Sequence, residues 1–253
     1  YIMGTVGNET FSPSAIPGVG YPVFATPMGG VQIPLGGRLG AFVHADGWSN
    51  ALDGICSSKD VVTTINAALA RCRSGYPDVV VVLPGHTENV AAADAWSNLV
   101  AGTQVIGLGH GTMRPTFTWT AAASTVLLNV NDVKLHNMIF EMAGPSGTTA
   151  ITVAAPMTIS GTNCTLSAIK AHTEIDADQG STIAFTTTAA ADDLTVQDCY
   201  FYGSGDGTLG TTILRLVGAD RFKMVNTVID GYTSSTTLGV LQMLTTESTA
   251  VYI

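Results

Sequence analysis

Six aspartates in the second half of the chain are its clearest candidates for catalysis. They are Asp176, Asp178, Asp192, Asp193, Asp198 and Asp206. Hydrolysis of a glycosidic bond generally uses two carboxyl groups about 5 to 10 Å apart, so the first four aspartates would line a side cleft if the chain acts on a saccharide. Asp176 and Asp178 fall within residues 174–180, which we interpret as an inserted loop. Carboxylate oxygens in such a loop are also suitable ligands for calcium.

Few basic residues are available to complete such a site. Polysaccharide lyases of the pectate lyase family pair a bound cation with a base that removes a sugar proton. The candidates here are Arg114, Lys134, Lys170, Arg215, Arg221 and Lys223. Lys134 and Lys223 occupy equivalent positions of two repeats, which favours a solvated outer face over a catalytic role. Tyr200, Tyr202 and Tyr232 are available for stacking on a sugar, and they are equally compatible with turns or with the core.

A Gly-His-Gly tripeptide occurs at residues 109–111. It resembles one part of the active site of the polygalacturonase family, whose members are also right-handed parallel β-helices. In that family, neighbouring coils add an Asn-Thr-Asp and an Asp-Asp upstream and an Arg-x-Lys downstream. This chain has no Asn-Thr-Asp, its Asp192-Asp193 pair follows the tripeptide, and no Arg-x-Lys can be placed in the same cleft. The glycines around His110 therefore predict a turn between strands.

The histidines and cysteines form no standard catalytic or metal-binding pattern. The histidines are His44, His86, His110, His136 and His172, without His-x-His or HExxH spacing, and the cysteines are Cys56, Cys72, Cys164 and Cys199, without a CxxC pair. Buried free thiols are the resulting prediction. We predict no catalytic, cofactor-binding or metal-binding residues, and no enzymatic activity.

The elements that hold these residues are indicated by a motif that recurs about every 30 residues. Its four copies are residues 132–140 (DVKLHNMIF), 163–171 (NCTLSAIKA), 193–201 (DLTVQDCYF) and 221–229 (RFKMVNTVI). The second position of each copy is apolar, and these positions are 31, 30 and 28 residues apart. Apolar and polar residues alternate at the start of each copy, as in a half-buried strand. Strands of this kind must stack on one another to share a core.

The predicted fold is therefore all-β, a right-handed parallel β-helix over residues 78–253. Weaker copies at residues 103–108 and 79–83 extend it to about five or six coils. Asn137, Asp198 and Asn226 share one position of the motif, with Ala168 as the exception. Asn and Asp tolerate left-handed backbone, so we interpret this column as the corner of each coil.

A helix and an arm precede the predicted coils. Within residues 55–77, the segment 58–73 (SKDVVTTINAALARCR) has apolar residues at helical spacing, with Ser58 as N-cap, and predicts a helix that caps the first coil. Residues 1–54 carry five prolines between positions 13 and 34, many glycines and many apolar residues. Such proline density predicts an extended arm with neither helix nor central strand. The arm would wrap its own solenoid or embrace a neighbouring subunit.

The composition of the chain argues against some classes of binding partner. The net charge is −9 with only 10 Lys and Arg, which argues against binding nucleic acid. No segment approaches the roughly 20 apolar residues of a membrane span, and no basic-then-apolar signal peptide opens the chain. Because the sequence begins at Tyr1 without Met, we expect a leading residue or segment to be missing.

The chain resembles β-helical virion proteins of tailed bacteriophages, with a pectate-lyase-like helix. The resemblance lies in the lead-in at residues 78–90 (DVVVVLPGHTENV), the capping helix and the apolar arm. It implies a capsid decoration or cement protein on the virion surface, a homotrimer that contacts the major capsid protein or its own copies through the arm. The alternative is a β-helical tail spike or fibre, or a carbohydrate-active lyase or glycosidase, that binds host glycan. A bacterial surface adhesin is a third possibility.

Overall fold

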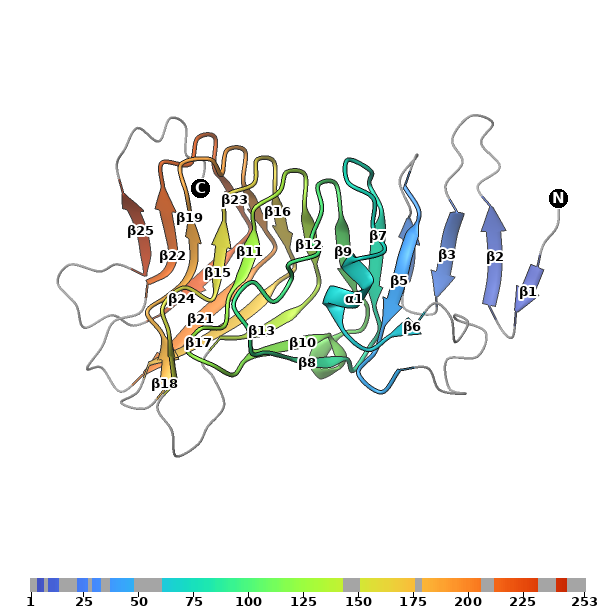
Figure 1. Cartoon of the computed structure of the whole chain (residues 1–253), viewed down its shortest axis with the longest axis horizontal. Coiled ribbons are helices and arrows are strands. Elements are labelled where there is room, and N and C mark those ends of the chain that lie inside the picture. Colours follow the sequence, from blue (N-terminus) through green and yellow to red (C-terminus); the bar gives the residue numbers. More distant parts are fainter. Residues whose placement is uncertain are drawn as a thin grey trace.

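The computed structural model describes residues 37–47, 61–142, 151–175, 179–205, 212–231 and 240–244, together with four strands between residues 4 and 32. Most of these residues form a parallel β-solenoid of about 5 turns (Figure 1). The coils lie side by side along the long axis of the molecule and follow one another in chain order. The predicted all-β parallel β-helix is confirmed. Among the described residues, no helix has the length and apolar character needed to cross a bilayer.

Three sheets run along the solenoid. The first sheet contains β6 (Val61–Val62), β5 (Leu39–Val43), β7 (Val79–Val82), β9 (Gln104–Gly107), β12 (Lys134–His136), β16 (Thr165–Ser167), β20 (Thr195–Gln197) and β23 (Lys223–Val225). The second contains β8 (Thr87–Val90), β10 (Thr116–Trp119), β13 (Ile139–Glu141), β17 (Lys170–Ile175), β21 (Tyr200–Gly205) and β24 (Val228–Asp230), with β18 (Gln179–Ser181) beside β17 and β14 (Ile151–Val153) beside β18. The third contains β11 (Val126–Leu128), β15 (Met157–Ile159), β19 (Ile183–Thr187), β22 (Thr212–Val217) and β25 (Leu241–Leu244).

The sequence repeat sets the register of the first sheet. The fourth motif position is paired from coil to coil in β12, β16, β20 and β23, and all four of its side chains are buried. The residue before this position points outward in every coil. Lys134 and Lys223 are exposed there, and Thr165 and Thr195, which pair with them from coil to coil, are half-buried. The alternation read from the sequence is therefore the alternation between core and surface.

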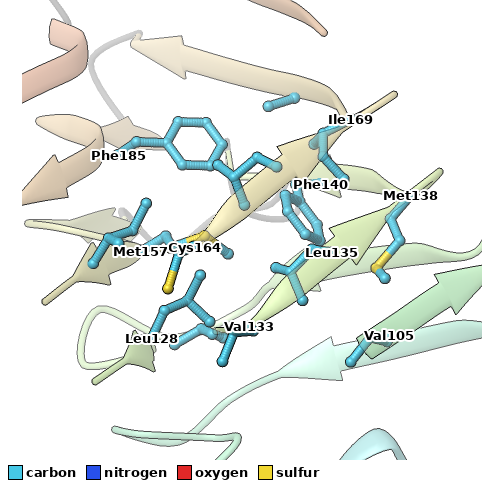
Figure 2. Packing of buried hydrophobic residues seen from close by; sticks show 14 of the residues in the cluster. Val105, Leu128, Val133, Leu135, Met138, Phe140, Met157, Cys164, Ile169 and Phe185 are labelled. Atoms are coloured by element: carbon cyan, nitrogen blue, oxygen red, sulfur yellow. The ribbon is translucent and has the colours of Figure 1, made fainter. Parts of the chain in front are cut away.

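The core is a continuous column of apolar side chains between the three sheets. Figure 2 shows Leu135, Phe140 and Met157, from three different strands, pointing into the same interior space. Larger rings fill the coils closer to the N-terminus, where Trp119 is fully buried and donates its indole N–H to Pro156 O at 3.0 Å. The Trp119 ring meets Phe140 edge-on, with 5.7 Å between centroids. Such packing removes the apolar face of every coil from water.

Two columns of left-handed residues mark the corners of the first sheet. One contains Asp132, Asn163, Asp193 and Arg221, the other Asn137, Ala168, Asp198 and Asn226, with φ from 45° to 62°. The prediction of a corner at the second column is confirmed. Asn137 Nδ2 donates to Gly107 O and Gly109 O in the preceding coil, both at 2.9 Å, so this side chain also ties two coils together.

Ala168 is the weak member of the second column, because its Cβ disfavours left-handed backbone by about 1–2 kcal/mol. We expect Ala168→Asn to raise the free energy of unfolding by about 0.5–1 kcal/mol, since Asn tolerates this conformation. Chemical denaturation measures the change. Ala190→Asn, at an exposed turn outside the left-handed region, is the matched control. An equal response of the two variants would contradict this interpretation.

The capping helix is shorter than predicted. Helix α1 spans only Ile65–Leu69, and Val61–Val62 form strand β6 instead of its first turn. Two β-branched residues favour the strand, and the Thr64 side chain then caps the helix by accepting from Ala67 N at 3.3 Å. Buried Ile65 and other apolar residues of α1 pack in the core with β5 and β7. Ser58, the predicted N-cap, lies outside the described residues.

Strands occur within residues 1–54, contrary to the prediction that the arm has no central strand. Strand β5 lies between β6 and β7 and continues the first sheet. Strands β1 (Gly4–Val6), β2 (Glu9–Pro13), β3 (Pro22–Thr26) and β4 (Gly29–Gln32) form a separate antiparallel sheet. The prolines are tolerated because Pro13 ends β2 and Pro22 begins β3, where a missing N–H does least harm to the ladder.

A buried carboxylate joins β5 to the first coil. Asp78, whose side chain is 0% exposed, accepts hydrogen bonds from Arg38 N and Arg73 N, both at 2.9 Å. The Arg73 guanidinium binds the same carboxylate, with Nη2 2.6 Å from Oδ1. Burial alone would raise the pKa of Asp78, but these hydrogen bonds and the Arg73 charge outweigh it and hold that pKa below its usual value.

The predicted free, buried thiols are confirmed for Cys164 and Cys199. Cys72 is also free and is partly exposed, while Cys56 lies outside the described residues. Burial raises the pKa of Cys199 to about 11. A thiol that stays protonated at neutral pH is a poor nucleophile, so Cys199 has a packing role.

Candidate functional site

The outer face of the second sheet carries a cluster of aromatic and charged side chains. Across β13, β17, β21 and β24, one row of paired residues is Glu141, His172, Tyr202 and Asp230, and the neighbouring row is Ile139, Lys170, Tyr200 and Val228. The alternate residues Phe140, Ala171 and Phe201 point into the core. The two rows therefore face outward on adjacent coils.

The rings in these rows are stacked. His172 and Tyr202 lie on adjacent strands with centroids 4.5 Å apart and planes 14° apart. Tyr200 and Tyr202, on one strand, have centroids 5.3 Å apart and planes 19° apart. The spacing between His172 and Tyr202 follows from the solenoid, because adjacent parallel strands are about 4.8 Å apart. Tyr200 is 41% exposed and is the most accessible ring of the three.

Charged groups of both signs flank the rings. Glu141 Oε2 lies 2.9 Å from His172 Nδ1, which orients the imidazole. The ammonium group of Lys170 lies 5.0 Å from the centroid of the Tyr202 ring, within cation–π range. We call Glu141, Lys170, His172, Tyr200 and Tyr202 the aromatic face. It offers an apolar ring surface beside hydrogen-bond donors and acceptors, which suits binding of an amphipathic ligand.

A serine–histidine pair lies on the outer side of the first sheet. His136 Nδ1 is 2.8 Å from Ser167 Oγ on the next coil, and burial lowers the pKa of His136. A neutral histidine beside a hydroxyl is the start of a nucleophilic site. However, Ser167 is only 9% exposed and its hydroxyl also approaches Leu135 O at 3.4 Å. The pair is therefore a polar tie between coils and does not present a nucleophile to a substrate.

The predicted aspartate cleft is only partly within the described residues. Asp193 binds the Arg221 guanidinium through two hydrogen bonds of 2.6 and 2.7 Å, which lower the pKa of Asp193. Asp192 accepts from Asp220 N at 3.1 Å. Both aspartates lie at the corner before β20, as part of the tie to the next coil. Asp198 accepts from Asn226 Nδ2 at 2.7 Å in the second corner column.

Four other residues weighed for chemistry, Asp176, Asp178, Asp206 and Tyr232, lie outside the described residues. Within the described part of the chain, no three His, Cys, Asp or Glu side chains are grouped as a metal site. Exposed His110 precedes the 3-10 turn η2 (Gly111–Met113), and Gly109 and Gly111 have φ of 100° and 57°. The turn predicted at the Gly-His-Gly tripeptide is thus confirmed.

The sequence predicts only part of the aromatic face. It offers Tyr200 and Tyr202 for stacking, but the motif does not reach His172 and Glu141. Extending the alignment of the repeats by one residue beyond the motif places His172 beside Tyr202, since the coils stay in register to that point.

No protein-family model, curated protein or solved structure matches this chain. Inferences about what it binds therefore depend on the geometry of its own residues.

Proposed function

We propose that this protein is a structural component of a tailed-phage virion, of the capsid decoration or cement type. In this proposal, residues 1–54 contact the major capsid protein or other copies of the chain, the protein assembles as a trimer on the capsid surface, and it has no catalytic role. The arrangement of β1–β4 is the observation that supports it most.

These four strands pair with one another in the order β1-β2-β3-β4. Among the described strands, β1 and β4 therefore each have a neighbour on one side only. The outer edge of such a strand presents backbone N–H and C=O groups that can pair with a strand of another chain. Figure 1 shows this sheet beyond β5, at the end of the solenoid opposite β25, where it would reach a neighbouring molecule.

Deleting residues 1–36 tests the proposal. The deletion ends before Arg38 and β5, because Arg38 N donates to Asp78 and β5 pairs with β7 of the first coil. We expect the shortened chain to keep a β-rich circular dichroism spectrum and the cooperative unfolding of the solenoid, but to change from a trimer to a monomer in light scattering. A shortened chain that is still trimeric would contradict the proposed role of residues 1–36. A full-length chain that is monomeric at all concentrations would contradict the trimer itself.

A further inference from the structure

We propose that the aromatic face binds a neutral saccharide, with the ring of Tyr200 as the platform on which a sugar stacks. This site differs from the aspartate cleft considered from the sequence. It also lies away from strands β1–β5 (Figure 1), so the proposal does not depend on the structural role above.

The first step of the argument is that the platform is already formed. Tyr202 stacks on His172 of the preceding coil, and Tyr200 stacks on Tyr202. Glu141 in turn holds the imidazole of His172. A ring that is ordered before binding loses little conformational entropy when a ligand packs on it.

The second step is accessibility. Tyr200 is 41% exposed, and its neighbour in the last coil, Val228, is 54% exposed. These two side chains extend an apolar surface on the outside of a sheet, where most neighbouring residues are polar. The C–H groups of a pyranose ring are apolar on one side, so they can pack on such a surface while the hydroxyl groups remain at its edge.

The third step is the polarity of the surroundings. Lys170 supplies hydrogen-bond donors, and Glu141 supplies acceptors, at the margin of the stacked rings. Asp230 is exposed beside Tyr202. Two carboxylates near one ammonium, on a chain of net charge −9, oppose an anionic ligand. Hydroxyl groups can donate to the carboxylates and accept from the ammonium, which selects a neutral sugar.

Calorimetric titration of the full-length chain tests the proposal. The probes are three neutral hexamers, maltohexaose, cellohexaose and mannohexaose, and one acidic hexamer, hexagalacturonate. We expect at least one neutral hexamer to bind with a dissociation constant on the order of 1 mM, and hexagalacturonate to bind more weakly. We expect Tyr200→Ala to weaken binding of the neutral hexamer about tenfold, and Tyr200→Phe, which keeps the ring, to change it less than about threefold.

Tyr76→Ala is the matched control, because Tyr76 is 48% exposed in the first coil, away from the aromatic face. It should leave binding unchanged. The proposal is overturned if none of the three neutral hexamers binds at about 10 mM, if hexagalacturonate binds best, or if Tyr200→Ala weakens binding no more than Tyr76→Ala does. A cooperative unfolding transition in each variant establishes that a loss of binding is not a loss of fold.

Discussion

Replacing Asp78 with Ala should lower the free energy of unfolding by about 2 kcal/mol or more. The substitution leaves Arg38 N and Arg73 N without the carboxylate that accepts from them, and it leaves the Arg73 guanidinium without its charge partner. The Arg73 side chain is 37% exposed, so water can solvate it in the variant, and the cost comes mainly from the two backbone N–H groups that lose their acceptor. Chemical denaturation of the full chain measures the loss.

The same group predicts a dependence on pH. Because the pKa of Asp78 is lower in the folded chain than in the unfolded chain, its contribution is fully present above the unfolded value of about 3.9. The contribution is lost as the pH falls through the lower, folded value. The stability difference between the native chain and Asp78→Asn should therefore shrink below about pH 4. Asp46→Ala, at an exposed turn, is the control and should change stability by less than about 0.5 kcal/mol.

Replacing Trp119 with Ala should cost about 3–5 kcal/mol of stability. Trp119 is fully buried, packs edge-on against Phe140, and donates to Pro156 O. The variant therefore creates a cavity and removes one of the two hydrogen bonds that Pro156 O accepts, while the bond from Val126 N at 2.8 Å remains. Thr118→Ala changes the neighbouring outward residue of the same strand and should cost less than about 1 kcal/mol.

The two midpoints of denaturation, compared at equal m-values, give the difference between these variants. A loss below about 1.5 kcal/mol for Trp119→Ala would show that the column of aromatic side chains closes around the gap. Trp119→Phe separates the two contributions, since it keeps most of the ring but removes the hydrogen bond to Pro156 O.

The repeat in the sequence predicted the fold because equivalent positions of its copies pair with one another in neighbouring coils. Positions Val133, Cys164, Leu194 and Phe222 are buried one above another, so the spacing of apolar residues was sufficient to stack the coils. Helix α1 was predicted too long because Val61 fits both the apolar spacing of a helix and the alternation of a strand. Only the pairing of β6 with β5 shows that Val61 belongs to a strand. For residues 1–54, proline density indicated extended backbone but gave no pairing partners.

The aromatic face was harder to predict for a geometric reason. Counting in twos from buried Val196 would place Tyr200 on the inside of the solenoid. However, the left-handed residue Asp198 lies between the two residues and turns the chain into the next sheet. Counting across such a corner loses the phase that decides between inside and outside. Once the corner is located, Phe201 falls inside, and Tyr200 and Tyr202 fall outside.

Each coil has one part with a constant number of residues, which contains both left-handed corners, and another part whose number of residues varies from coil to coil. In the four motif coils, the two left-handed residues are always five positions apart, and β13, β17, β21 and β24 always begin two residues after the second of them. The coil lengths of 31, 30 and 28 residues therefore differ only beyond that point. Insertions and deletions can accumulate between a strand of the second sheet and the next strand of the first sheet. The strands of the first sheet and the corners that flank them keep the same length in each of these coils.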